Sequence, residues 1–152
     1  MNRFEGKVVL VTGASTGIGL ETIRRIAAEG GRVFAAHRRA SADVGEAESV
    51  HLDVTREGDW AAAIDHVTER AGRLDVLVNN AGVRESGGVE ETSLAVWSLL
   101  IDTNLTSIFL VCRAAVPAIR RSGGGAIVNI GSITGIRGTE RMVAYSASKS
   151  GI

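Results

Sequence analysis

Several features that would point to particular classes of protein are scarce in this sequence. It has one cysteine, Cys112, which cannot form a disulfide within the chain and lies in an apolar run, so we expect a buried structural thiol. Its 17 basic residues balance 17 acidic ones, which gives no sign of a surface for nucleic acid or anionic lipid. No apolar run reaches the roughly 18 residues that span a bilayer, and the N-terminus lacks a signal-peptide core. We therefore expect a cytoplasmic protein that binds neither membrane nor nucleic acid.

Repeats, linkers and low-complexity stretches are also missing, which predicts one domain across 1–152. The chain is 45% apolar and 22% charged, as in ordinary globular proteins. Short β-branched runs alternate with helical patterns, and this alternation predicts a three-layer α/β fold with a doubly wound, mostly parallel sheet. The predicted strands are 7–12, 33–36, 50–52, 74–78 and 126–130, and the predicted helices are 18–28, 57–70 and 93–121. The polar segment 40–48 is too short for a crossover helix and is expected to form a turn.

Apolar spacing assigns the core. Trp60 lies at helical spacing with Ile64 and Val67 and is predicted to be a core residue rather than a stacking platform. His51 lies within a strand and is expected to be a packed histidine rather than a ligand. The helix at 93–121 is apolar over more than a single stripe, so a further helix or a second subunit should cover it.

Three glycines, Gly13, Gly17 and Gly19, lie between the first strand and the first helix. Gly13 would allow a sharp exit from the strand, and Gly17 and Gly19 would let backbone amides and the helix N-terminus approach a pyrophosphate. A glycine turn alone is often structural, but its place between strand and helix favours a dinucleotide site.

Polar residues follow the next three strands. Residues 37–39 (His-Arg-Arg) follow the second strand, where no acid is present to bind the ribose diol of NAD. Asp53 and Val54 end the third strand, and Asp53 could instead cap the turn into Thr55. Residues 79–82 (Asn-Asn-Ala-Gly) follow the fourth strand, at an edge where open α/β folds bind ligands, although an Asn pair is also common in turns.

A possible catalytic group lies near the C-terminal end. Tyr145 and Lys149 are four residues apart and would share one face of a helix, and Ser132 stands after the fifth strand. A free phenol has a pKa of about 10, and a nearby ammonium lowers it toward the range useful for proton transfer. A serine hydroxyl could then bind the oxygen whose proton is transferred. A Tyr and a Lys at this spacing are by themselves most often a solvated pair.

Taken together, these motifs resemble the short-chain dehydrogenase/reductase family over the whole chain. The matching positions, in order, are Thr12 to Gly19, Asn79-Asn80-Ala81-Gly82, Asn104, Ser132, and Tyr145 with Lys149. The glycine spacing resembles the short type, such as 3-oxoacyl-[acyl-carrier-protein] reductases, rather than the extended, epimerase-like branch. Members of this family have a Rossmann fold and transfer a hydride between a nicotinamide dinucleotide and a carbonyl or secondary alcohol.

The resemblance implies a role for each matching residue. Tyr145 would be the general acid or base, and Ser132 would orient the substrate oxygen. Lys149 would lower the phenol pKa and hold the nicotinamide ribose, while Asn104 would support a water in a proton relay. A basic residue matching Arg38 favours NADP over NAD, although Thr16 stands where many NADP-dependent relatives carry a second base. The implied cofactor-binding set is Gly13, Ser15, Thr16, Gly17, Ile18, Gly19, Arg38, Asp53, Val54, Asn80, Ala81, Gly82, Tyr145 and Lys149, with no metal site.

Two alternatives stand beside this hypothesis. The chain could be a non-catalytic dinucleotide-binding module, or it could perform lyase or epimerase chemistry, which the glycine spacing disfavours. Family members continue with the rest of the last helix, two further strands and a substrate lid. We therefore expect residues 1–152 to be the N-terminal part of a longer single-domain enzyme. That enzyme would act on a small carbonyl or alcohol and form a homodimer or homotetramer.

Overall fold

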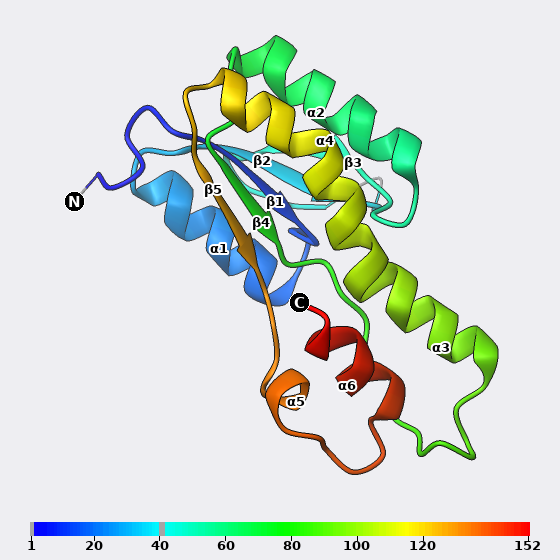
Figure 1. The fold of residues 1–152 in the computed structure, drawn as a ribbon. Helices are drawn as coiled ribbons and strands as arrows, with labels where there is room; N and C mark the ends of the chain where they lie inside the picture. The colour runs from blue at the N-terminus through cyan, green and yellow to red at the C-terminus, as the bar shows by residue number, and fades with distance from the viewer. Residues whose placement is uncertain (1, 40–41) are drawn as a thin grey trace.

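The computed structural model describes residues 2–39 and 42–152, whose strands form one parallel five-stranded sheet (Figure 1). The strands are β1 (Val8–Thr12), β2 (Arg32–His37), β3 (Glu48–His51), β4 (Val76–Asn79) and β5 (Ala126–Asn129). Their order is β3-β2-β1-β4-β5, and every neighbouring pair is parallel. The predicted strands and the α/β fold class are confirmed.

Helices cover both faces of the sheet. They are α1 (Gly17–Ala28), α2 (Glu57–Ala71), α3 (Leu94–Ile101), the π-helical segment η1 (Asp102–Thr106), α4 (Ser107–Arg121), α5 (Ile133–Ile136) and α6 (Val143–Ser150). Helix α1 lies on one face, and α2 and α4 lie on the other (Figure 1). Alternate residues of β1 enter the two cores, Val9 with Ile23 of α1 and Leu10 with Trp60 of α2. Because both faces are buried, β1 is apolar from Val8 to Val11 and ends in the buried Thr12.

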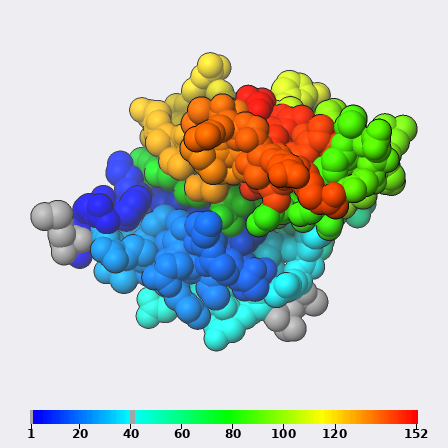
Figure 2. Space-filling model, turned by 90° about the horizontal axis from the view of Figure 1, so that it is seen from below, coloured from blue at the N-terminus to red at the C-terminus, as the bar shows by residue number. Residues whose placement is uncertain are grey.

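The order of the strands places a crevice between β1 and β4. The chain runs outward from β1 to β2 and β3, then crosses to the other side of β1 to form β4 and β5. Connections leave β1 and β4 in opposite directions at this switch point, where open α/β sheets bind ligands. Figure 2 views the molecule from the end toward which the strands point. The N-terminal segments, in blue, and the C-terminal segments, in orange and red, lie on opposite sides of a seam there.

The predicted helix at 93–121 is continuous but not regular. Segment η1 widens it for one turn between α3 and α4, a feature that the apolar spacing did not indicate. The combined run Leu94–Arg121 is 28 residues long and contains an 18-residue window with a mean hydropathy of 1.7, so by length and composition it could cross a membrane. The run is not continuously apolar, because Asp102 and Asn104 interrupt it, and one such helix is weak evidence for a membrane span. Helix α4 packs Val111 and Ala115 into the core beside α2, and core helices of globular domains share this composition.

The structure confirms the predicted burial of Trp60 but not that of His51 or Cys112. Trp60 is fully buried, as predicted. His51 is not packed: its side chain is 71% exposed, with Nε2 3.9 Å from Asp59 Oδ2. Strand β3 is at the edge of the sheet and alternates between buried Val50 and exposed neighbours, so His51 faces solvent. Cys112 is half-buried on α4 rather than fully buried, and burial raises the pKa of its thiol.

Two connecting segments lead into β3 and α6. Residues 42–47 contain no helix, as predicted, while 40 and 41 lie outside the described residues. The segment from Thr134 to Val143 contains Gly135 and Gly138 and leads into α6. Its first residues belong to the short helix α5, for which Ser132 is the N-cap.

Candidate active site

The turn between β1 and α1 requires glycine at two positions. Gly13 has φ +64°, in the left-handed region that favours glycine. A Cβ on Gly19 would overlap the carbonyl oxygen of Gly13 and the side-chain nitrogen of Asn80. The turn is therefore packed directly against the segment that follows β4.

Asn80 joins the ends of β1 and β4. Its Nδ2 donates to the carbonyl oxygens of Thr12 and Gly13, at 2.9 and 3.2 Å. In return, Thr12 Oγ1 accepts from the backbone nitrogens of Asn80 and Ala81, at 3.1 and 3.0 Å. Because both hydrogens of the Asn80 amide group are used in this way, the side chain braces the glycine turn.

The N-terminus of α1 carries an uncompensated positive end. Thr16 is the N-cap, but its side chain makes no capping hydrogen bond, and the first turn contains no acidic residue. The first backbone N–H groups of a helix have no partners within it and carry a partial positive charge. This helix end therefore suits a phosphate.

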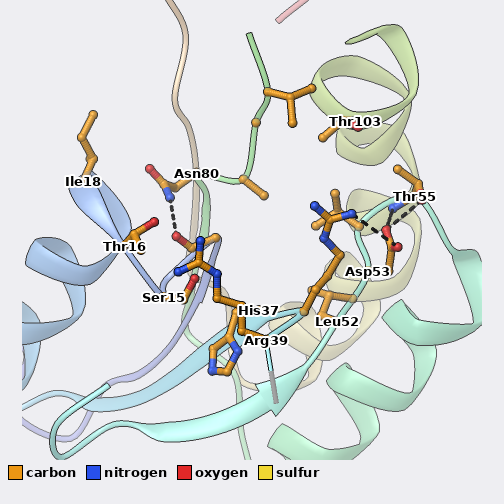
Figure 3. A pocket seen from close by; sticks show the side chains of 16 residues that line it. Ser15, Thr16, Ile18, His37, Arg39, Leu52, Asp53, Thr55, Asn80 and Thr103 are labelled. Carbon is orange, nitrogen blue, oxygen red and sulfur yellow. Dashed lines mark hydrogen bonds and ion pairs between the residues drawn. The ribbon is translucent and has the colours of Figure 1, made fainter. Parts of the chain in front are cut away.

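A cavity of about 420 Å³ opens beside this turn (Figure 3). Predicted cofactor residues that line it are Gly13, Ser15, Thr16, Ile18, Arg38, Asp53, Val54, Asn80, Ala81 and Gly82. It is also lined by His37, Arg39, Leu52, Thr55, Val83 and Thr103, which the sequence analysis did not assign to the site. All but Thr103 adjoin a predicted residue at a strand end, so widening each motif by a residue or two would have found them. Gly17, Gly19, Tyr145 and Lys149 are not among the lining residues.

Arg38 and Asp53 face each other across one end of the cavity. Arg38 Nη1 lies 3.9 Å from Asp53 Oδ2, and the Arg38 side chain is 69% exposed. Asp53 Oδ1 accepts from the backbone and the hydroxyl of Thr55, at 3.0 and 2.8 Å, which is the cap considered above as an alternative. Burial raises the pKa of the Asp53 carboxyl, but these hydrogen bonds and the charges of Arg38 and Arg56 outweigh it and hold the pKa below its usual range.

His37 ends β2, close to where an acidic residue would bind the ribose diol of NAD. The residue is buried, and its Nε2 lies 2.8 Å from Ser49 Oγ on β3. Its Nδ1 has no hydrogen-bond partner among residues 2–39 and 42–152. The end of β2 therefore presents no carboxylate to the cavity.

Lys149 and Tyr145 both lie on α6, four residues apart as predicted. The Lys149 Nζ donates to the carbonyl oxygen of Ile130, at 2.7 Å, which anchors α6 to the end of β5. Burial lowers the pKa of the Lys149 ammonium. Within the described chain, the Tyr145 hydroxyl makes no hydrogen bond to Ser132 or Lys149.

Ser132 is held by α5. Its Oγ accepts from the backbone nitrogen of Thr134 at 3.3 Å and from the Thr134 hydroxyl at 2.9 Å. Since the hydroxyl of Ser132 is the acceptor in both bonds, its own proton stays available to a further acceptor.

Asn104 lies in η1 and links three segments. Its Oδ1 accepts from the backbone nitrogen of Val83 at 2.8 Å, and its Nδ2 donates to Val83 O at 2.9 Å and to Ser148 Oγ at 3.0 Å. A Cβ on Gly82 would lie 3.2 Å from Asn104 Oδ1 and 3.8 Å from Lys149 Nζ. Gly82 also lines the cavity, so the cavity and the predicted catalytic residues meet at this glycine.

Comparison with known proteins gives consistent matches. The family model described as short chain dehydrogenase matches residues 7–152. The chain is 40% identical over 154 residues to 3-alpha-(or 20-beta)-hydroxysteroid dehydrogenase of Mycobacterium tuberculosis, covering 97% of this chain and 59% of that protein. It is 38% identical over 162 residues to cyclopentanol dehydrogenase of Comamonas testosteroni, covering 100% of this chain and 65% of that protein.

A solved structure agrees with these matches. A short chain dehydrogenase from Mycobacterium smegmatis superimposes with a TM-score of 0.93 at 38% identity, covering 99% of this chain and 68% of that one. The chain thus spans less than two thirds of the length of the two relatives named above.

Proposed function

The chain belongs to the short-chain dehydrogenase family, and we propose that it carries the cofactor site and the catalytic group of an oxidoreductase. The enzyme would transfer a hydride between a nicotinamide dinucleotide and a carbonyl or secondary alcohol. The position of Gly82 between the cavity and the predicted catalytic residues carries this proposal. Gly82 lines the cavity, and a side chain there would meet Asn104 and Lys149. A ligand that fills the cavity past Gly82 would reach the catalytic residues.

The described residues fit a dinucleotide. The uncapped N-terminus of α1 would bind the pyrophosphate, and Asp53 and Asn80 would border the adenosine. Lys149 would hold the nicotinamide ribose. Bound there, the dinucleotide supplies or accepts the hydride. With His37 rather than an acid at the end of β2, and Arg38 and Arg39 lining the cavity, we propose NADP as the preferred cofactor.

Proton transfer would fall to Tyr145. Its hydroxyl is uncommitted to Ser132 or Lys149 among the described residues and can face a substrate oxygen. Ser132, which accepts two bonds from Thr134, would donate its own proton to that oxygen and orient it. The buried cation of Lys149 would stabilise the phenolate, and Asn104 would hold η1 in place for a proton relay.

The substrate class we propose is an alicyclic secondary alcohol or the matching ketone. The two relatives are named for a hydroxysteroid and for cyclopentanol; the cyclopentanol hydroxyl and the steroid 3-alpha-hydroxyl lie on carbon rings, and the 20-beta-hydroxyl lies on the side chain of a ring system. Beside Ser132, Ile133 and Ile136 are largely exposed and offer apolar surface to a hydrocarbon ring.

The enzyme would be a cytoplasmic homodimer or homotetramer. Apolar side chains of α3 and α4 face solvent, among them Leu99 and Phe109. Exposed apolar surface of this kind is typical of subunit contacts.

The experiment is to purify the complete protein and follow NADPH and NADH oxidation with cyclopentanone, cyclohexanone and the open-chain control 2-pentanone. We expect turnover that is faster with the cyclic ketones and with NADPH. NADPH binding without turnover of any ketone would favour the non-catalytic module instead. Equal turnover of cyclic and open-chain ketones would reject the proposed substrate class but not the reaction.

A further inference from the structure

Ser148 occupies a fully buried position between two predicted catalytic residues. Its Oγ donates to the carbonyl oxygen of Tyr145 at 2.8 Å and accepts from Asn104 Nδ2 at 3.0 Å. We infer that Ser148 is a positioning residue, which fixes Asn104 of η1 relative to the Tyr145 end of α6. This inference rests on the proposed function.

The hydrogen-bonding capacity of the Asn104 amide shows how firmly it is fixed. One hydrogen of Nδ2 goes to Val83 O and the other to Ser148 Oγ, while Oδ1 accepts from Val83 N. A flipped amide would set Nδ2 against the Val83 N–H, and would set Oδ1 against a hydroxyl whose proton is already used. Val83 and Ser148 therefore select the same orientation of Asn104.

The place of Ser148 in α6 gives this bond its mechanical role. Helix α6 is joined to other segments by hydrogen bonds from Lys149 to Ile130, from Ser150 to Gly135 and from Val143 to Gly87. The bond from Asn104 to Ser148 adds a point on η1, one residue before Lys149. Without it, a buried Nδ2 hydrogen has no acceptor, and α6 can shift relative to η1 and the Gly82 side of the cavity. Proton transfer depends steeply on such small displacements, whereas of the proposed cofactor contacts only those of Tyr145 and Lys149 lie on α6.

The test compares two serine substitutions on the same helix. Ser148→Ala removes the link, and Ser146→Ala is the matched control, because the Ser146 hydroxyl is buried but has no partner in the part of the chain that the structure describes. In the complete protein we expect kcat to fall about 10-fold in Ser148→Ala, with a larger solvent deuterium isotope effect and a much smaller change in the Kd for NADPH, because most of the proposed cofactor contacts lie outside α6. Ser148→Thr should restore most of kcat, since a threonine hydroxyl in a helix can still bond to the carbonyl three residues earlier.

Two results would overturn the inference. One is an equal kcat and isotope effect in Ser148→Ala and Ser146→Ala. The other is a fall in kcat matched by a loss of NADPH affinity and of thermal stability, which would show a purely structural role.

A second measurement does not depend on turnover. The Val83 N–H donates to Asn104, so its hydrogen exchange should be faster in Ser148→Ala than in Ser146→Ala. Equal exchange in the two variants would contradict the inference. If the unmodified protein reduces no ketone, the proposed function fails, while Val83 exchange still decides whether Ser148 fixes Asn104.

Discussion

Asn104 pairs with both backbone groups of Val83, as a neighbouring strand would. The two bonds, of 2.8 and 2.9 Å, join η1 to the segment that follows β4. The side chain is almost wholly buried, so water does not compete for its amide. A widened helical turn is thereby fastened to the loop that lines the cavity.

A change of one Asn104 atom tests this pairing. Asn104→Asp keeps the shape and the acceptor for Val83 N but sets an oxygen against Val83 O and removes the donor to Ser148. We expect the free energy of unfolding to fall by roughly 1 to 3 kcal/mol, because Val83 O and Ser148 Oγ lose their donor and a carboxylate replaces a neutral amide in a buried position. Thermal and urea unfolding measure it, with the exposed Asn2→Asp as control. Equal stability of the two variants would show that the pairing contributes nothing.

Removing the Tyr145 hydroxyl tests the proposed acid or base. Tyr145→Phe keeps the packing of the ring but leaves no phenolic oxygen. Turnover of cyclic ketones by the complete protein should fall by at least ~10²-fold, while NADPH affinity stays nearly unchanged. Steady-state kinetics and a fluorescence titration measure the two quantities. Near-normal turnover would assign proton transfer to another group.

The two arginines after β2 test the cofactor preference. Arg38→Asp should weaken NADPH binding by about 2 kcal/mol and spare NADH, because a carboxylate would replace the partner of the 2′-phosphate. Arg39→Asp is the comparison at the next lining residue, and Arg56→Asp is the control, since Arg56 does not line the cavity. Should Arg38→Asp affect both cofactors equally, or neither, Arg38 is only a solvated charge paired with Asp53.

The glycine turn can be tested with one methyl group. Gly19→Ala places a Cβ against the Gly13 carbonyl and Asn80, so the turn must open. We expect lower thermal stability and a loss of affinity for both dinucleotides. Gly58→Ala is the matched control, because Gly58 lies in α2 with no atom within 4 Å of an added Cβ, and alanine favours helix by up to about 1 kcal/mol. Unchanged affinity in Gly19→Ala would contradict the packing.

Asp75 predicts how stability depends on pH. Burial raises the pKa of its carboxyl, but hydrogen bonds from Arg73 and from Val8 N and the charge of Arg73 outweigh this and hold the pKa below its usual range. In the unfolded chain the Asp75 carboxyl binds a proton near pH 4. Its ionised form therefore contributes fully to the free energy of unfolding above about pH 4, and this contribution is lost as the pH falls through the folded pKa.

Asp75→Asn provides the measurement. The variant should be less stable than the unmodified protein at neutral pH, and the difference should shrink as the pH falls below about 4. Urea unfolding across this range gives both curves. A difference that stays constant down to the acid limit would show that Asp75 does not titrate with unfolding.

Local sequence determined the strands and most of the helices. The run from Val8 to Val11 is apolar and mostly β-branched at consecutive positions, which suits a strand buried on both faces. The positive φ of Gly13 and the spacing of Tyr145 and Lys149 likewise depend on local chain geometry. These properties are set by chain geometry over a few residues, so the sequence alone contains them.

Contacts between distant segments were decided only by the tertiary structure. Asn104 meets Val83 across 21 positions and Ser148 across 44, and no local spacing encodes either pairing. The widening at η1 was not visible, because apolar spacing reports which face is buried and not how each carbonyl is paired. His51 was misplaced for a related reason. Composition marks a strand, but only the order of strands in the sheet decides which one lies at the edge, and at the edge a side chain can face water.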